Sequence, residues 1–170
     1  MKRASDKDYE KFREYFSFSC VDLLIFDGKS ILLTKRTISP FKGYWHLPGT
    51  IIRRNEKREN AVKRAAREEL GKEITIKREL GVYESIVPFR HDISNAFIVK
   101  FKNKGSIKTD FQGEEFKFFK KFDNFPENVV LPEPCNPDNN TTDGLPVTFN
   151  SDVSLPIKAV SSSCVILISN

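Results

Sequence analysis

Residues 48–71 read PGTIIRRNEKRENAVKRAAREELG, and they contain the clearest helix pattern in the chain. Small and apolar residues between Ala61 and Leu70 recur at the spacing of one helix face, and no Gly or Pro interrupts residues 56–70. Gly71 follows directly, at the position where helices often end in a left-handed glycine. The sequence therefore predicts one well-defined helix over 56–70, entered from a Pro-Gly loop.

The segments on either side of this helix alternate between strand patterns and turns. A capping pattern at Ser5 and aromatic residues at helical spacing predict a helix over 5–16. An Asp27-Gly28 turn between two β-rich runs predicts a hairpin. The expected strands are 20–26, 30–34, 74–76, 81–87, 97–101 and 116–122, with a loop over 38–48. Strands arranged around one central helix indicate an α/β (α+β) sandwich.

Composition restricts the class of protein further. The chain has 170 residues, a net charge of +5, 39% hydrophobic and 30% charged residues, which is typical of one soluble globular domain. No apolar run is long enough to span a membrane, and the charged N-terminus lacks a secretory pattern, so we expect a cytoplasmic protein without a membrane partner. The basic residues are dispersed, which argues against a nucleic-acid partner. Three widely spaced cysteines indicate neither a disulfide framework nor a zinc site.

The composition changes near residue 132. From there to 163 the chain is rich in Pro, Asn, Asp, Thr and Ser, and it ends in the apolar run Cys164–Ile168. We expect a domain over 1–131 and a poorly ordered tail over 132–170.

Two adjacent carboxylates mark the predicted central helix. Glu68 and Glu69 stand side by side, and Arg64 lies one helical turn before Glu68. Mg²⁺ prefers oxygen ligands and is usually held by one or two carboxylates plus substrate phosphates. An ordinary surface ion pair between Arg64 and Glu68 is the alternative interpretation of the same residues.

The order of residues favours the metal site, because the stretch from Gly49 to Gly71 resembles the signature of the Nudix hydrolases. Five residues stand at fixed positions of that signature with the correct spacing: Glu56, Arg64, Glu68, Glu69 and Gly71. Thr50 replaces the second glycine, Ala65 replaces a glutamate that is a metal ligand in most of the family, and Lys72 replaces an apolar residue. The resemblance implies the Nudix α/β/α sandwich, a mixed sheet between helices.

One branch of the family also lacks that glutamate, and this chain is similar to it: the GDP-mannose mannosyl hydrolases. The similar stretches are Asp8-Tyr9, residues 32–37 and residues 42–49. The resemblance implies a Mg²⁺-dependent hydrolase, with Mn²⁺ as an alternative metal, that acts on a nucleoside diphosphate sugar such as GDP-mannose. Water attacks the sugar C1 in this branch and releases the nucleoside diphosphate and the sugar. The branch is usually dimeric, which suggests a homodimer here.

The resemblance also implies roles for single residues. The carbonyl of Gly49 and the carboxylate of Glu69 would hold the metal, and Glu68, retained as in ordinary Nudix enzymes, would be a further ligand. Arg36 would contact the diphosphate, as its guanidinium suits bidentate phosphate recognition. Arg64 would be structural and orient Glu69.

Other positions depart from the branch. Ile51 stands where a second diphosphate-binding arginine is expected, so Arg53 or Arg54 would have to replace it. Tyr44, beside Trp45, either stacks on the nucleobase or belongs to the core.

The general base is the least determined residue. Asn95 stands where the branch has a histidine, and His91, in an expected loop over 89–92, is the candidate that could replace it. Glu114 and Glu115 are rivals. Two alternatives therefore remain: an ordinary Nudix pyrophosphohydrolase that splits the diphosphate, and a catalytically impaired nucleotide-binding module.

Overall fold

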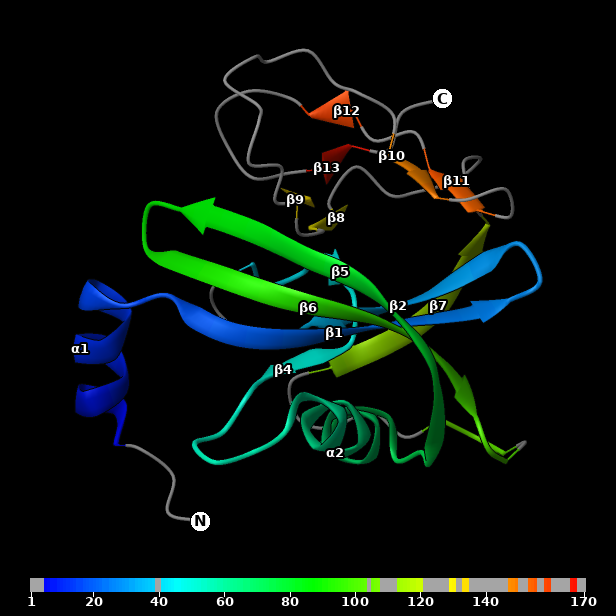
Figure 1. Cartoon of the computed structure of the whole chain (residues 1–170), viewed down its shortest axis with the longest axis horizontal. Coiled ribbons are helices and arrows are strands. Elements are labelled where there is room, and N and C mark those ends of the chain that lie inside the picture. Colours follow the sequence, from blue (N-terminus) through cyan, green and yellow to red (C-terminus); the bar gives the residue numbers. More distant parts are fainter. Residues whose placement is uncertain are drawn as a thin grey trace.

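The computed structural model describes residues 5–38, 41–103, 105–107 and 113–120, together with six short strands between 129 and 167. Figure 1 shows a central sheet, with α2 beneath it and α1 at one end. The main elements are α1 (Asp6–Tyr15), β1 (Phe18–Asp27), β2 (Ser30–Arg36), β3 (Trp45–His46), β4 (Gly49–Ile51), α2 (Arg58–Leu70), β5 (Ile74–Val87), β6 (Arg90–Phe101) and β7 (Gly113–Lys120).

The sheet is mixed, as the sequence predicted. Its strand order is β8-β3-β2-β1-β6-β5-β9, where β8 is Val129–Val130 and β9 is Glu133–Pro134, and β4 pairs with β1 and β7 with β2. β1 runs parallel to β6 and antiparallel to β2 and β4. The mixed sheet with flanking helices confirms the expected fold class.

Both predicted helices are present, and local signals explain their ends. The Oγ of Ser5 accepts a hydrogen bond from the N–H of Asp8 at 3.2 Å, which caps α1. At the other end of α2, Gly71 has φ 61°, and its N–H donates to the carbonyl of Arg67 at 3.1 Å. α2 begins at Arg58, two residues later than expected.

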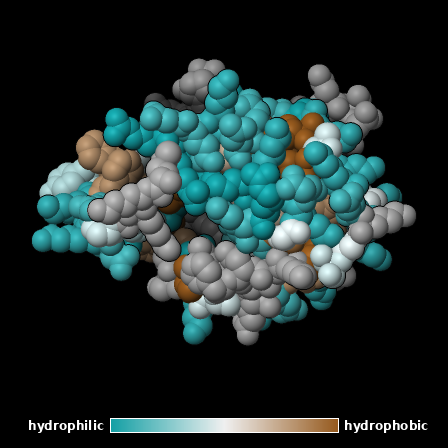
Figure 2. Space-filling view, turned by 90° about the horizontal axis from the view of Figure 1, so that it is seen from below, coloured by the Kyte–Doolittle hydropathy of each residue, from teal (hydrophilic) through white to brown (hydrophobic). Residues whose placement is uncertain are grey.

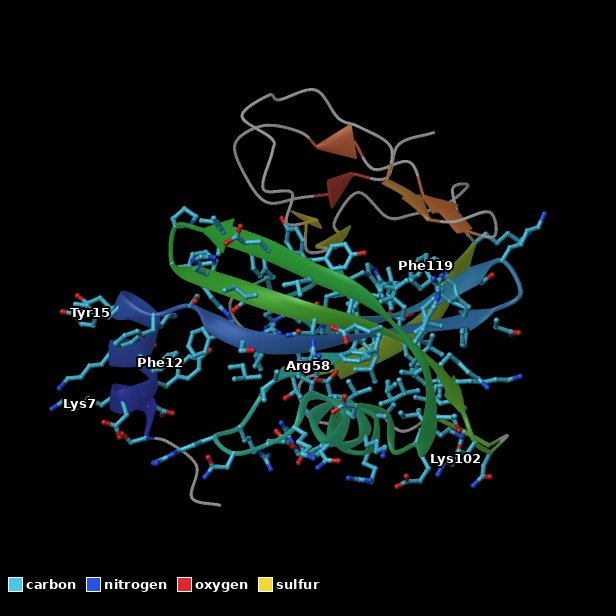
Figure 3. The ribbon with its side chains drawn as sticks, viewed as in Figure 1. Lys7, Phe12, Tyr15, Arg58, Lys102 and Phe119 are labelled. Atoms are coloured by element: carbon cyan, nitrogen blue, oxygen red, sulfur yellow. The ribbon has the colours of Figure 1, made fainter. Side chains whose placement is uncertain are left out.

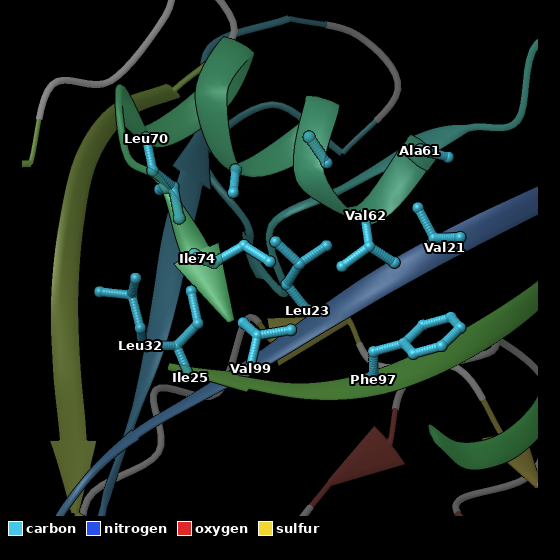
Figure 4. Packing of buried hydrophobic residues seen from close by; sticks show 12 residues of the cluster. Val21, Leu23, Ile25, Leu32, Ala61, Val62, Leu70, Ile74, Phe97 and Val99 are labelled. Carbon is cyan, nitrogen blue, oxygen red and sulfur yellow. The ribbon is translucent and has the colours of Figure 1, made fainter. Parts of the chain in front are cut away.

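Two apolar clusters stabilise the sheet, one on each face of β1. The cluster between α2 and the sheet joins residues of the helix to β1, β2, β5 and β6 (Figure 4). It consists of Val21, Leu23, Ile25, Leu32, Ala61, Val62, Ala65, Ala66, Leu70, Ile74, Phe97 and Val99. The opposite cluster joins β1, β5 and β6 to β2, β3 and β7: Leu24, Ile31, Leu33, Trp45, Leu47, Tyr83, Ala96 and Phe119. Because β1 and β2 pair only next to their turn, this second cluster fills the space where the two strands diverge.

The face of α2 that points away from the sheet is charged. Glu59, Lys63 and Arg67 are exposed there, and the surface seen from this side is largely hydrophilic (Figure 2). Neither α1 nor α2, nor any other part of the described chain, provides a helix long and apolar enough to cross a membrane.

Several strand boundaries differ from the prediction. The two strands expected at 74–76 and 81–87 are one strand, β5, with irregular pairing around Gly81, whose φ is 148°. The predicted loop over 38–48 contains β3.

The expected loop over 89–92 is also wrong from Arg90 onward, because β6 begins there. Antiparallel pairing with β5 and parallel pairing with β1 supply hydrogen-bond partners for the backbone of this stretch.

The last strands lie around the expected domain boundary and beyond it. β8 (Val129–Val130) pairs with β3, and β9 (Glu133–Pro134) pairs with β5 just past residue 131. β10 (Val147–Phe149) and β11 (Val153–Leu155) pair with each other, as do β12 (Lys158–Ala159) and β13 (Ile166–Leu167). All other residues of the expected tail lie outside the described residues.

Candidate active site

A contact between β4 and α2 brings the first two candidate metal ligands together. Gly49 faces Asp22 in the pairing of β4 with β1. The adjacent bond from the N–H of Leu23 to the carbonyl of Pro48 (2.8 Å) shows that the peptide groups of Gly49 point away from β1. The N–H of Gly49 donates instead to Oε2 of Glu69 at 3.0 Å. Since the N–H and C=O of one strand residue point the same way, the Gly49 carbonyl and the Glu69 carboxylate lie at the same edge.

Arg64 ties the loop before α2 to the helix. Its side chain is buried and donates to both carboxylate oxygens of Glu56, at 2.8 and 2.9 Å, and to Oε2 of Glu68 at 2.9 Å. It also donates to Oγ1 of Thr50 at 3.3 Å and to the carbonyl of Ile51 at 2.9 Å. These five bonds match the five N–H groups of a guanidinium. They hold Glu56 and Glu68, whereas the sequence had predicted that Arg64 orients Glu69.

The two remaining acidic residues of the signature, Glu56 and Glu68, form ion pairs with arginines. The hydrogen bonds from Arg64 lower the pKa of Glu56. Glu68 accepts from Arg64 through one oxygen and from Nη2 of Arg53 through the other, at 3.2 Å. Arg53, expected at the substrate, is half-exposed in this ion pair.

Asp22 lies directly beside Gly49 and was not singled out in the sequence. Asp22 is partly buried, and desolvation raises its pKa to about 6, while a hydrogen bond from Ser94 acts in the opposite direction. The signal for this residue was present: Asp22 is the one charged residue in the apolar run 20–26. Burying a carboxylate costs free energy, so a carboxylate retained in a largely apolar strand indicates a functional site.

Arg36 ends β2 at the same part of the molecule. Its N–H donates to the carbonyl of Tyr44 at 2.9 Å and its carbonyl accepts from Gly43 at 2.8 Å, so it closes the loop that follows β2. Burial and the charge of Arg90 lower the pKa of the Arg36 side chain, while Glu69 opposes this effect. Arg36 therefore lies within electrostatic range of the candidate metal ligand, and its contact with a diphosphate stays a prediction.

A second polar group, the Arg90 cluster (Tyr9, Phe18, Arg90 and Asp92), lies where α1 meets the sheet. Nε of Arg90 donates to Oδ1 of Asp92 at 2.6 Å, and Nη1 donates to the hydroxyl of Tyr9 at 2.9 Å. The guanidinium lies over the ring of Phe18, 4.8 Å from its centre. Figure 3 shows Phe12, on the same helix, pointing toward the sheet, and Tyr15 pointing away from it.

The two candidate base positions, His91 and Asn95, lie on the face of β6 opposite to Arg90 and Asp92. Side chains alternate along a strand, so His91 points away from the face that carries Arg90 and Asp92. Nε2 of His91 lies 2.6 Å from Oε1 of Glu84. The Asn95 amide is buried, donates to the carbonyl of Cys20 at 3.0 Å and accepts from Arg58 at 2.9 Å. Arg58 lies between α2 and the sheet (Figure 3), so its hydrogen bond to Asn95 links the first residue of α2 to β6.

Aromatic residues form two groups near the loop after β2. Trp45 is buried against Phe119, with ring centres 4.8 Å apart, and belongs to the core. Tyr44 is 36% exposed and contacts Phe41, which in turn contacts Phe89 at 5.7 Å between ring centres. Tyr44 is thus accessible to a ligand, while Trp45 is not.

The remaining candidates lie elsewhere. Glu115, at the exposed end of β7, pairs with Lys35 at 3.8 Å, and the side chain of Glu114 lies outside the described residues. The second histidine, His46, is partly buried, and desolvation lowers its pKa to about 4, so its imidazole is neutral at physiological pH. Nδ1 of His46 donates to the carbonyl of Leu47 at 2.7 Å.

Comparisons with known proteins establish the family. The model of the NUDIX domain matches residues 17–139, and the chain therefore belongs to the Nudix family. It is 38% identical over 116 residues to the ADP-ribose pyrophosphatase of Methanocaldococcus jannaschii, which covers 66% of this chain and 68% of that protein. It is 30% identical over 125 residues to the low-salt glycan biosynthesis protein Agl8 of Haloferax volcanii, covering 69% and 80% respectively.

Solved structures agree with this assignment. The crystal structure of a MutT NUDIX hydrolase from Burkholderia pseudomallei superimposes with a TM-score of 0.59 at 27% identity, over 67% of this chain and 90% of that one. The predicted Nudix hydrolase class is thereby supported, and the substrate is a separate question.

The donor set at Gly49 suits a magnesium ion that the substrate helps to hold. Within the described residues no group of three or more His, Cys, Asp or Glu side chains could hold a metal alone. Mg²⁺ usually keeps several waters and combines one or two carboxylates with substrate phosphates. One carboxylate, Glu69, next to one backbone carbonyl, Gly49, is consistent with that mode of binding.

Proposed function

We propose that this chain is a Mg²⁺-dependent hydrolase of a nucleoside diphosphate sugar, in which water attacks C1 of the sugar. The observation that carries the proposal is the different use of the three glutamates. Glu56 and Glu68 accept hydrogen bonds from arginines, whereas Glu69 is placed at Gly49. A single carboxylate ligand is what the mannosyl-hydrolase branch implies, and Ala65 agrees with it.

The residues around Gly49 supply the other requirements of this reaction. Bound Mg²⁺ would neutralise charge on the diphosphate and on the departing nucleoside diphosphate. Gly49 and Glu69 would hold the ion, and Arg36 would bind the phosphate oxygens. Tyr44 has the exposure needed to contact the nucleoside.

Asp22 is the best-placed general base. Its pKa near 6 gives an ionised carboxylate at neutral pH that still accepts a proton readily. Asp22 would take one proton from water as the water oxygen bonds to C1. The bond from C1 to the diphosphate oxygen breaks in the same step, and its electron pair leaves with the nucleoside diphosphate. His91, paired with Glu84 on the other face of β6, is the alternative base.

A second candidate function is attack at phosphorus, which would release a nucleoside monophosphate and a sugar phosphate. The relative named ADP-ribose pyrophosphatase favours this reaction. The relative named for glycan biosynthesis favours a sugar-linked substrate for either reaction.

The test is phosphorus NMR in ¹⁸O-labelled water with GDP-mannose, ADP-glucose and ADP-ribose, with Mg²⁺ or with EDTA. Attack at C1 gives an unlabelled nucleoside diphosphate and free sugar. Attack at phosphorus gives an isotope-shifted phosphate resonance, which would overturn the carbon mechanism. No turnover of any substrate would instead support the catalytically impaired binding module.

A further inference from the structure

The proposed function assigns one arginine, Arg36, to a diphosphate that has two phosphate groups. A diphosphate esterified at both ends carries about two negative charges, one on each phosphate. Arg36 lies within electrostatic range of one metal ligand, Glu69. The residue expected to supply a second guanidinium, Arg53, already donates to Glu68 and is half-exposed.

Arg90 has the geometry that Arg53 lacks. Its guanidinium is fixed by Asp92, by the Tyr9 hydroxyl and by the ring of Phe18, so three different elements hold it. Its side chain is about one-fifth exposed. A weak contact to Sγ of Cys20 at 3.9 Å is the third bond described for its five N–H groups. A fixed, partly buried guanidinium with further donors is well suited to a phosphate.

The chain folds so that Arg36 and Arg90 flank the same aromatic contact. Phe41 belongs to the loop that Arg36 closes, and Phe89 directly precedes Arg90. The contact between these two rings therefore joins the loop after β2 to the turn before β6. Consistent with this, the charge of Arg90 acts on Arg36. Two like charges in a partly buried site repel each other, and an anion between them would relieve this repulsion.

We propose that Arg90 is the second substrate-binding arginine, which binds the diphosphate together with Arg36, while Asp92 and Tyr9 position it. The inference rests on the proposed function, because it assigns a partner to the diphosphate of that substrate. It places substrate recognition on β6 and α1 in addition to the signature residues. It also predicts that ligands with one phosphate use Arg90 less than ligands with two.

The test is calorimetric titration of the full chain with GDP, ADP and GMP, with Mg²⁺ and again with EDTA. Arg90→Gln should weaken GDP or ADP binding by about 10-fold or more and GMP binding by less. Tyr9→Phe should weaken the diphosphates about two- to five-fold, because it removes one positioning hydrogen bond. The matched control is Arg67→Gln, an exposed arginine on α2 that pairs with Glu73, and it should change nothing.

Arg90→Lys keeps the positive charge but loses the paired N–H donors that bind a phosphate through two oxygens. It therefore tests the inference even if Arg90→Gln fails to fold. Folded Arg90 variants that bind GDP and ADP as tightly as the parent chain would overturn the inference. If the parent chain also hydrolyses a nucleotide sugar, the proposed function survives that result. Binding that depends on Arg90 without any turnover would support the inference and count against the proposed hydrolase. A parent chain that binds no diphosphate would overturn both.

Discussion

Gly49 approaches Asp22 so closely across β1 and β4 that a Cβ atom on Gly49 would lie 2.3 Å from Oδ1 of Asp22 and 2.5 Å from the carbonyl of Val21. A backbone oxygen cannot rotate away, so any side chain at this position must displace β4. The peptide group that would move is the one whose N–H contacts Glu69. The same glycine therefore controls both the strand pairing and the candidate metal site.

Gly49→Ala should destabilise the protein by about 1–3 kcal/mol, as overpacking does, and should reduce hydrolysis at least 100-fold because the ligands separate. Urea unfolding and kcat/KM measure the two effects. The control is Gly28→Ala in the β1–β2 turn, where φ is +57° and no atom lies within 4 Å of the added Cβ. It should cost about 1 kcal/mol of stability and leave kcat/KM unchanged. Full activity in Gly49→Ala would contradict the close-approach argument.

The buried guanidinium of Arg64 makes a different prediction. Arg64→Gln should destabilise the protein by about 3–5 kcal/mol, since it leaves Glu56 with an uncompensated charge in a partly buried place. Arg64→Lys should recover only part of this loss, because an ammonium group cannot reproduce the fork. Thermal and urea unfolding would show this. Arg67→Gln on the exposed face of α2 should change stability by no more than about 0.5 kcal/mol, and equal midpoints for both variants would refute the structural role.

Glu68 and Glu69 are neighbours in sequence but should respond differently to substitution. Glu69→Gln removes the proposed carboxylate ligand and should lower kcat/KM at least 100-fold, since several kcal/mol of charge stabilisation depend on the metal. Glu68→Gln should lower it no more than about five-fold, as Glu68 mainly balances Arg53 and Arg64.

Mn²⁺ binding followed by EPR separates these roles without requiring turnover. Glu69→Gln should lose the bound Mn²⁺ signal in the presence of GDP, and Glu68→Gln should keep it. Glu73→Gln, which alters an exposed acid at the end of α2, is the control. Equal loss in the Glu68 and Glu69 variants would mean that both carboxylates are ligands, as in the ordinary Nudix pattern.

Local signals made the central helix predictable. The apolar stripe and Gly71 lie within one segment, and the cap geometry and burial of α2 follow from them. The turn at Asp27-Gly28 is equally local. That Gly49 meets Glu69, twenty residues later in the chain, came from the family resemblance and not from any periodicity.

Residues brought together by distant strand pairing were missed. Cys20 pairs with Ser94 in the parallel ladder between β1 and β6, across more than seventy residues. This pairing places Asp22 beside Ser94 and brings Arg90 to α1. A polar run such as 89–92 resembles a loop when its partners are unknown, which explains the wrong prediction for the start of β6.

Asp22 links the pH dependence of stability to that of activity. Its pKa is raised from 3.8 to about 6 in the folded chain, so the folded state binds more protons than the unfolded state between these values. Stability contributed by this group is therefore present below pH 4 and is lost as pH rises through 6. Asp22→Asn should stabilise the protein by about 2–3 kcal/mol at pH 8 and by much less at pH 4. Urea unfolding at both pH values would test this, with Asp27→Asn as an exposed control on the same strand.

The activity of the parent chain should rise with pH over the range in which the stability contributed by Asp22 is lost. In the parent chain kcat/KM should rise with an apparent pKa near 6, because the ionised Asp22 accepts the proton from water. Asp22→Asn should abolish this limb and lower kcat/KM by about 10²–10⁴-fold, the usual contribution of a general base. His91→Gln should retain the limb, since His91 pairs with Glu84 on the opposite face of β6. If the limb disappears in His91→Gln and persists in Asp22→Asn, the base is His91, and the raised pKa of Asp22 reflects burial alone.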